Sequence, residues 1–177
     1  MAFERTGSDE IWSGRIAGVR VDTFRHDDGE EVQREIVSHP GAVGIVAHDG
    51  EKLFLVRQPR EPVGEQGLLE LPAGKLDEEG EGPLETAKRE LAEEIGKAAG
   101  RWEHLVTFYA SPGFSDEEIH VYLATDLRDE AAEAEENERI EVETHPLAEL
   151  DDLIRTCTDA KTLVGLLWLK AYGSGGE

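Results

Sequence analysis

The stretch LELPAGKLDEEGEGPLETAKRELAEEIG (69–96) decides how the rest of the chain is interpreted. Its second half predicts a helix over 83–95, because proline is favoured at the first helical position and Gly96 is a natural stop. One set of apolar residues follows helical spacing and is expected to face a core: Leu84, Ala87, Leu91 and Ile95. The helix is therefore expected to pack within a folded domain.

The same helix concentrates carboxylates at its C-terminal end. At about 100° per residue, Glu90, Glu93 and Glu94 fall within one quadrant beside the apolar face. Like charges at these spacings repel by roughly a few tenths of a kcal/mol per pair, and acids in the last turn oppose the helix dipole. A divalent cation would reverse both penalties, so the cluster predicts half of a magnesium site whose other half is a phosphorylated ligand. A solvated acidic face is the alternative.

The loop before the helix favours the metal site. Gly74 and Gly80 permit backbone conformations that other residues resist. The segment PAGK (72–75) could turn its carbonyl groups toward the same cation. A glycine-containing loop that leads into a carboxylate helix is a suitable scaffold for binding a metal and a diphosphate together.

Residues 74–96 resemble the Nudix box, whose pattern is Gly-x5-Glu-x7-Arg-Glu-(apolar)-x-Glu-Glu-x-Gly-(apolar). The part from Glu81 to Gly96 matches every fixed position. Two departures stand out: six residues instead of five separate Gly74 from Glu81, and Lys97 replaces the usual apolar residue. The insertion falls in the loop and leaves the helix acids unaffected.

The chain further resembles the ADP-ribose pyrophosphatase branch of the Nudix hydrolases. Residues 57–77, RQPREPVGEQGLLELPAGKLD, look like the segment that this branch carries before the box, and Pro112 stands where the branch has a proline. Residues 135–142 and 159–169 are similar to later segments of the branch. The resemblance therefore covers residues 41–169.

The resemblance implies which residues hold the metal. Glu90 and Glu94 would be the main ligands of magnesium, for which manganese would substitute, with Glu93 close by. The carbonyl group of Ala73 would complete the set. Glu81 would orient the loop or join a second metal.

The resemblance also implies residues that serve the reaction. Arg89 would orient a box glutamate by a charge-assisted hydrogen bond, although an ordinary helix ion pair is the alternative, and Glu93 is counted with the catalytic residues as well as with the metal ligands. The general base must be a carboxylate that reaches the attacking water. In this branch it comes from a loop after the late strands, here residues 135–141, where Glu136 is favoured and Glu138 is next.

Five residues are candidates for binding the substrate. Arg60 offers bidentate donors for a phosphate or for the terminal ribose, and Glu70 would hydrogen-bond the substrate. Pro112, Gly113 and Phe114 would shape the wall of the pocket. The alternatives are a surface arginine, an outward-facing strand acid and a plain Pro-Gly turn.

The order of elements predicts a mixed sheet between helical layers. Strands are expected at 11–24, 30–39, 41–58 (a hairpin turning at Asp49-Gly50), 68–71, 101–110, 118–127 and 139–145, and further helices at 147–156 and 160–172. The family resemblance implies the same class, an α/β/α sandwich around a mixed sheet with a small N-terminal β-sheet.

Three segments are expected along the chain. Residues 1–40 hold the N-terminal strands, which fit the small dimer-forming sheet of the branch. Residues 41–172 form the Nudix hydrolase domain, and residues 173–177 form a disordered tail. The resemblance implies a homodimer that exchanges its N-terminal sheets.

Composition narrows the functional classes. The chain has 177 residues and a formal charge of −22, so it would repel nucleic acids and anionic membranes. It has no apolar run long enough for a transmembrane helix and no secretory signal at its N-terminus. Its single cysteine, Cys157, fits a reducing cytoplasm.

The expected function is the magnesium-dependent hydrolysis of ADP-ribose to AMP and ribose 5-phosphate. One alternative is another nucleoside diphosphate sugar, such as GDP-mannose, or a dinucleotide. A second is a Nudix module that binds ADP-ribose without hydrolysing it, which the intact glutamates disfavour. A third is an acidic interaction protein, which would leave the spacing of the box unexplained.

Overall fold

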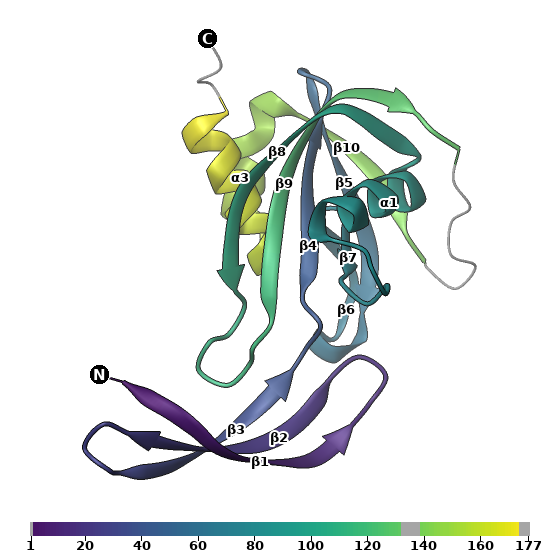
Figure 1. Ribbon diagram of the computed structural model, residues 1–177. Helices are drawn as coiled ribbons and strands as arrows, with labels where there is room; N and C mark the ends of the chain where they lie inside the picture. The colour runs from purple at the N-terminus through teal and green to yellow at the C-terminus, as the bar shows by residue number, and fades with distance from the viewer. Residues whose placement is uncertain (1, 132–138, 174–177) are drawn as a thin grey trace. The chain divides into compact units, whose positions relative to one another are not determined.

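The computed structural model describes residues 2–131 and 139–173. The chain divides into two compact units. The first contains Met1–Gly41 and Phe108–Glu118, and the second contains Ala42–Thr107 and Ile119–Glu177. Figure 1 labels the strands of both units and helices α1 and α3, and its colours follow the chain from the N-terminus to the C-terminus. None of the helices in the described residues combines the length and apolar character needed to cross a membrane.

The first unit is built on a three-stranded antiparallel sheet in the order β1-β2-β3. Its strands are β1 Phe3–Ser13, β2 Gly18–His26 and β3 Glu31–Ser38. The loop at 111–117 is joined to β3 by main-chain hydrogen bonds. Val37 N donates to Phe114 O at 2.8 Å, and Asp116 N donates to Val37 O at 3.3 Å.

The expected single strand over 11–24 is wrong. The chain turns at residues 14–17, where Gly14 N donates to Ala17 O at 2.9 Å, so the first residues of that range end β1 and the rest belong to β2. Because β1 is exposed along nearly its whole length, it has no apolar alternation by which the sequence could reveal it.

The second unit contains a seven-stranded mixed sheet in the order β10-β5-β4-β9-β8, with β6 paired to β5 and β7 paired to β4. The pairing of β4 with β9 is parallel, whereas β5 pairs with β4, β6 and β10 in antiparallel fashion. The strands are β4 Ala42–His48, β5 Lys52–Arg60, β6 Glu65–Glu70, β7 Ala73–Lys75, β8 Lys97–Tyr109, β9 Glu118–Asp129 and β10 Glu141–Pro146.

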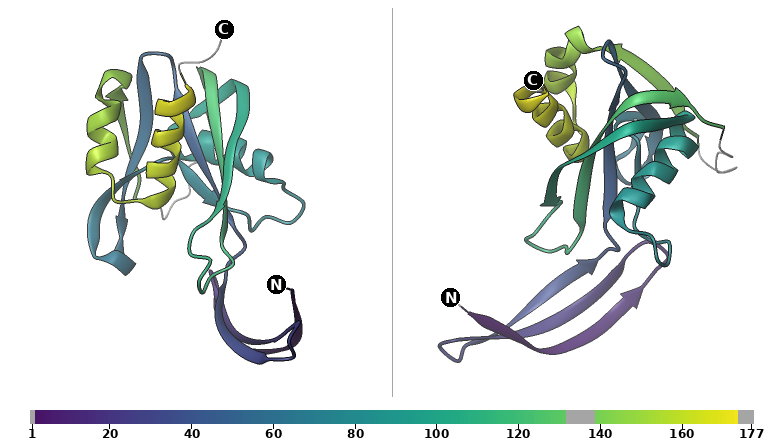
Figure 2. Two further views of the ribbon diagram at one scale, coloured as in Figure 1. Left: turned by 90° about the vertical axis from the view of Figure 1, so that its left-hand side faces the viewer. Right: turned by 45° about the horizontal axis from the view of Figure 1, so that its top comes forward.

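Helices cover both faces of this sheet (Figure 1). Helix α1, Pro83–Ile95, packs on β4 and β7, and α3, Ala160–Tyr172, packs on β4 and on α2, Leu150–Thr156. Two further views show the same layers (Figure 2). Short 3-10 turns occupy Glu61–Val63 and Leu147–Glu149. The predicted α/β/α architecture with a small N-terminal sheet is confirmed.

The core under α1 is apolar and fully enclosed. Ala87 and Leu91 of the helix and Val43 and Ile45 of β4 are all 0% exposed. Helix α1 has the predicted bounds, with Pro83 in its first turn and Gly96 at its end with φ +64°. Burying the apolar face of α1 fixes its rotation, so the adjoining acids are held at the edge of the core.

Candidate functional site

Four glutamates and one arginine lie on α1 and the turn before it, and we call them the box cluster: Glu81, Glu90, Glu93, Glu94 and Arg89. Arg89 Nη1 donates to Glu90 Oε1 and to Glu93 Oε2, each at 2.8 Å. Its Nε lies 3.2 Å from Glu81 Oε2. Burial lowers the pKa of Arg89, but the carboxylates of Glu90, Glu93 and Glu81 outweigh burial and raise it. Arg89 therefore remains charged.

Glu94 ties the helix to the short strand β7. Its Oε2 accepts a hydrogen bond from Ala73 N at 2.8 Å, and the residue is only 8% exposed. The next residue, Gly74, lies against Glu90: a Cβ at position 74 would stand 2.0 Å from Glu90 Oε1. A side chain at position 74 would therefore displace the Glu90 carboxylate from its place against β7.

The donor set of the box cluster fits a hard divalent cation. Carboxylate and carbonyl oxygens are the ligands that magnesium prefers, and the absence of a Cβ at Gly74 lets the Glu90 carboxylate lie directly against β7. Within residues 2–131 and 139–173, no three His, Cys, Asp or Glu side chains are already arranged to hold a metal ion. The Arg89 guanidinium instead joins the carboxylates of Glu90 and Glu93.

The structure explains both departures from the Nudix pattern. The segment before α1 forms a turn in which Glu81 N donates to Glu78 O at 3.2 Å and Gly80 has φ +88°. The longer spacing therefore falls in a turn outside the helix. Lys97 lies with its Nζ 5.5 Å from the centroid of the Phe54 ring and pairs with Asp129. The Lys97 ammonium group thus lies over the face of an aromatic ring, which is a favourable cation–π contact.

A second group of charges lies at the start of α3, and we call it the Glu70 cluster: Glu70, Arg60, Lys161 and Asp159. Glu70 is 0% exposed. Arg60 donates to it in bidentate fashion, Nε to Oε1 at 2.6 Å and Nη2 to Oε2 at 2.9 Å. The hydrogen bond to Glu70 raises the pKa of Arg60 against the effect of burial, and the nearby charges of Glu94 and Asp159 raise it further.

Lys161 and Asp159 complete the Glu70 cluster, and sequence reasoning assigned no role to either. Lys161 donates to Glu70, and it also donates to Asp159 Oδ2 at 3.0 Å. Asp159 is the N-cap of α3 and accepts from Thr162 N at 3.0 Å. Asp159, three residues before Thr162, could have been predicted from the sequence as a helix N-cap. That pattern does not predict a contact with Glu70, which lies 91 residues from Lys161.

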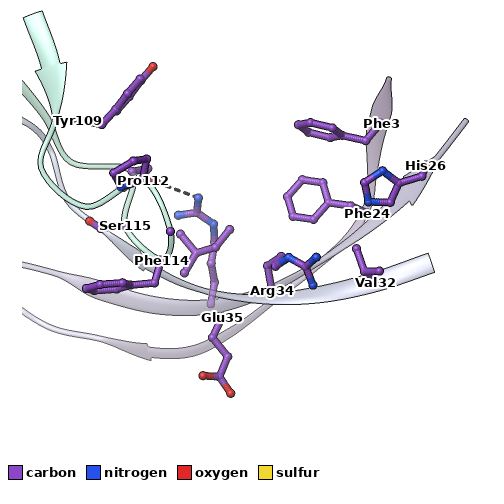
Figure 3. A pocket seen from close by; sticks show the side chains of 14 residues that line it. Phe3, Phe24, His26, Val32, Arg34, Glu35, Tyr109, Pro112, Phe114 and Ser115 are labelled. Atoms are coloured by element: carbon purple, nitrogen blue, oxygen red, sulfur yellow. Dashed lines mark hydrogen bonds and ion pairs between the residues drawn. The ribbon is translucent and has the colours of Figure 1, made fainter. Parts of the chain in front are cut away.

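Pro112, Gly113 and Phe114 line one pocket of the first unit, with a volume of about 430 Å³. Figure 3 shows Pro112 and Phe114 on one side of it and Phe24 on the other. Phe24 packs edge-on against Phe3 with ring centroids 5.5 Å apart. The pocket thus offers aromatic surface that would suit a flat ring.

Sequence-predicted residues thus fall into separate groups. The five metal candidates lie together at β7, α1 and the turn before it, and Arg60 pairs with Glu70 instead of standing apart from it. Glu136 and Glu138, the candidate bases, lie outside the described residues.

Comparisons with known proteins identify the family of this chain. The NUDIX domain model matches residues 38–164. A protein of Bacillus methanolicus named methanol dehydrogenase activator is 40% identical over 92% of this chain and 90% of its own length. The ADP-ribose pyrophosphatase of Bacillus subtilis (strain 168) is 41% identical over 92% of this chain and 89% of its own length.

A solved structure shares the fold. It is described as an ADP compounds hydrolase, and it superposes with a TM-score of 0.85 at 24% identity, covering 99% of this chain and 97% of that one. The family model spans most of the chain and includes the whole box cluster. This chain therefore belongs to the NUDIX domain family.

Proposed function

We propose that this chain is a magnesium-dependent ADP-ribose pyrophosphatase, which hydrolyses ADP-ribose to AMP and ribose 5-phosphate. The observation that carries the proposal is the box cluster, in which one arginine pairs with three glutamates and a fourth, Glu94, is hydrogen-bonded to β7. The relative named ADP-ribose pyrophosphatase supports the substrate, because its identity of 41% extends over 92% of this chain. Manganese is the expected substitute for magnesium.

Glu90, Glu94 and the Ala73 carbonyl group are the proposed metal ligands, with Glu93 and Glu81 close to them. Bound magnesium would supply positive charge that draws electrons from the diphosphate and acidifies the attacking water. The chain itself sets the ligand positions, since Glu94 is hydrogen-bonded to Ala73 N and Arg89 holds Glu93 and Glu81.

The reaction breaks one phosphorus–oxygen bond of the diphosphate as water adds its oxygen to that phosphorus. The water gives up a proton, which we assign to a carboxylate acting as general base. Glu136 is the favoured base and Glu138 the second choice. The leaving phosphate oxygen departs as part of the second product, so each product carries one phosphate group.

Arg60 is the proposed phosphate or ribose contact, and its partner Glu70 would act with it. Pro112, Gly113 and Phe114 are proposed to contact the substrate through their pocket. Residues 1–40 would form the dimerisation sheet of a homodimer and residues 41–172 the hydrolase domain, in a protein that works in the cytoplasm. Sedimentation as a strict monomer would contradict the dimer.

The test is a substrate panel. ADP-ribose, GDP-mannose, NADH and diadenosine polyphosphates are each incubated with the chain in magnesium and then in excess EDTA, and the products are separated by chromatography. Magnesium-dependent release of AMP, fastest from ADP-ribose, is the expected result. Faster turnover of another compound would change the assigned substrate but not the type of reaction. Binding of ADP-ribose without hydrolysis would indicate a protein that senses ADP-ribose.

A further inference from the structure

The charges of the Glu70 cluster cancel. Two carboxylates, Glu70 and Asp159, face two cations, Arg60 and Lys161. The Glu70 side chain is 1% exposed and that of Lys161 is 14% exposed, whereas that of Arg60 is 40% exposed. Lys161 is thus directed to its partners inside the protein, and Arg60 is the member of the cluster that reaches solvent.

One edge of the Arg60 guanidinium is hydrogen-bonded to Glu70, and the other edge can bind a ligand. Nε and Nη2 bind Glu70, while Nη1 donates to none of the residues that the structure describes. The charge of Glu94 acts on Arg60 and contributes to its raised pKa, after the larger contribution of the Glu70 hydrogen bond. Arg60 therefore lies within electrostatic reach of the box cluster.

Main-chain contacts join the start of α3 to the same region. Leu71 N, which follows Glu70, donates to Thr162 Oγ1 at 2.8 Å, and Thr162 is 1% exposed. Pro72 O accepts from Ile45 N at 2.9 Å, and Ala73 N donates to Glu94. Hydrogen bonds of the consecutive residues 71–73 therefore tie this segment to α3, to β4 and to α1 in turn.

We propose that Lys161 is a positioning residue for substrate binding, acting through Glu70 on Arg60. Lys161 shares Oε2 of Glu70 with Arg60 and neutralises Asp159. Without the ammonium group the cluster would carry a net negative charge, and that charge would draw the Arg60 guanidinium inward and oppose an anionic substrate. The inference rests on the proposed function, because it takes Arg60 as the phosphate contact.

A purely structural role would not need this arrangement. Apolar side chains of similar volume often stabilise a protein as well as a buried ion pair does. Here the buried pair instead holds one edge of a half-exposed arginine in a fixed orientation. Fixing that edge lowers the ordering cost of binding a phosphate, which is the general benefit of preorganisation.

The test is a double-mutant cycle between Lys161→Met and Arg60→Met, with steady-state kinetics on ADP-ribose. Lys161→Met alone is expected to raise KM about tenfold and to change kcat less than about twofold. In the Arg60→Met background it should change KM less than about twofold, because its route to the substrate is gone. Lys161→Arg, which restores the charge, should recover most of the affinity.

Lys170→Met is the matched control. It removes the same charge from the same helix, but Lys170 pairs with Asp151 at the surface, with 53% of its side chain exposed. Its KM should equal that of the unmodified chain. Calorimetric binding of the α,β-methylene analogue of ADP-ribose, which cannot be hydrolysed at that bridge, gives a second readout independent of turnover.

The possible outcomes separate a failure of the positioning role from a failure of the proposed function. Equal KM values for Lys161→Met and the unmodified chain, or multiplicative effects of the two substitutions, would overturn the positioning role while leaving the pyrophosphatase intact. An unmodified chain that neither hydrolyses ADP-ribose nor binds the analogue would overturn the proposed function itself, and the phosphate role of Arg60 with it.

Discussion

The box cluster and the Glu70 cluster use the same kinds of side chain to different ends. In the box cluster four carboxylates lie near a single cation, Arg89, which pairs with three of them, and in the Glu70 cluster two carboxylates face two cations. Uncompensated acid that is held in place invites a metal ion. In a cluster whose buried charges balance, the ion pairs hold the side chains in fixed positions. Charge balance, more than the presence of acids, separates the proposed metal-binding role of one cluster from the proposed positioning role of the other.

The strongest test of the comparison is Glu94→Gln. Removing one proposed ligand should lower kcat by about three orders of magnitude, while the amide oxygen can still accept from Ala73 N. The melting temperature should change little. Glu85→Gln, an equal charge change on an exposed residue of the same helix, is the control. Near-full activity in Glu94→Gln would contradict the proposal that Glu94 is a metal ligand.

Gly74→Ala should be next in effect. Its new methyl group would stand 2.0 Å from Glu90 Oε1, so the Glu90 carboxylate or β7 must shift. A drop in kcat of about 100-fold is expected, since small misplacements of reacting groups are costly. Gly44→Ala on β4 is the control, because its nearest neighbour, Leu71 Cδ1, would lie at an ordinary 3.8 Å. Equal kinetics for both variants would contradict the close-approach argument.

Arg89→Met and Lys161→Met compare the clusters directly by thermal unfolding. Each should lose about 2 kcal/mol through an unpaired carboxylate, or about 4–8 °C in Tm. Magnesium should restore most of the loss in Arg89→Met, because the metal replaces the missing cation. In Lys161→Met it should raise Tm no more than in the unmodified chain. Similar rescue of both variants would show that the clusters are not different in kind.

The smallest effect is expected at Cys157, which adjoins the Glu70 cluster and donates its thiol to Asp159 O at 3.3 Å. Burial raises the pKa of this thiol, so the reactive thiolate is scarce at pH 7. Iodoacetamide should label it slowly, and faster as the pH rises above about 8.5. Cys157→Ala should keep its activity within about twofold of the unmodified chain. Rapid labelling at pH 7 would contradict the shift.

Local signals made α1 predictable from the sequence. Pro83 and Gly96 mark its ends, the apolar spacing marks its buried face, and the structure agrees at both bounds. Strand β1 was missed because nearly all of it is exposed. Strand β7, with only three residues, was taken for part of a glycine-containing loop. Short or exposed strands form through pairing, and pairing partners leave no local pattern.

In the candidate site, too, the features with a local sequence pattern were predictable and those that depend on long-range packing were not. The box acids are neighbours on one helix, so their spacing reveals them. The link between Glu70 and Lys161 spans 91 residues and exists only after β6 and α3 have packed together. Arg60 and Glu70 were predicted as two separate substrate contacts, and their bidentate ion pair could not be inferred from sequence.

Arg89 allows the protein to fold before it binds magnesium. By holding Glu81, Glu90 and Glu93 it acts as a resident counterion, so the helix need not await magnesium in order to form. Newly made chains would then mature first and acquire their metal afterwards. Unlike a zinc finger, which unfolds when its metal is removed, this chain should survive chelation and regain its full function on simple readdition of the ion.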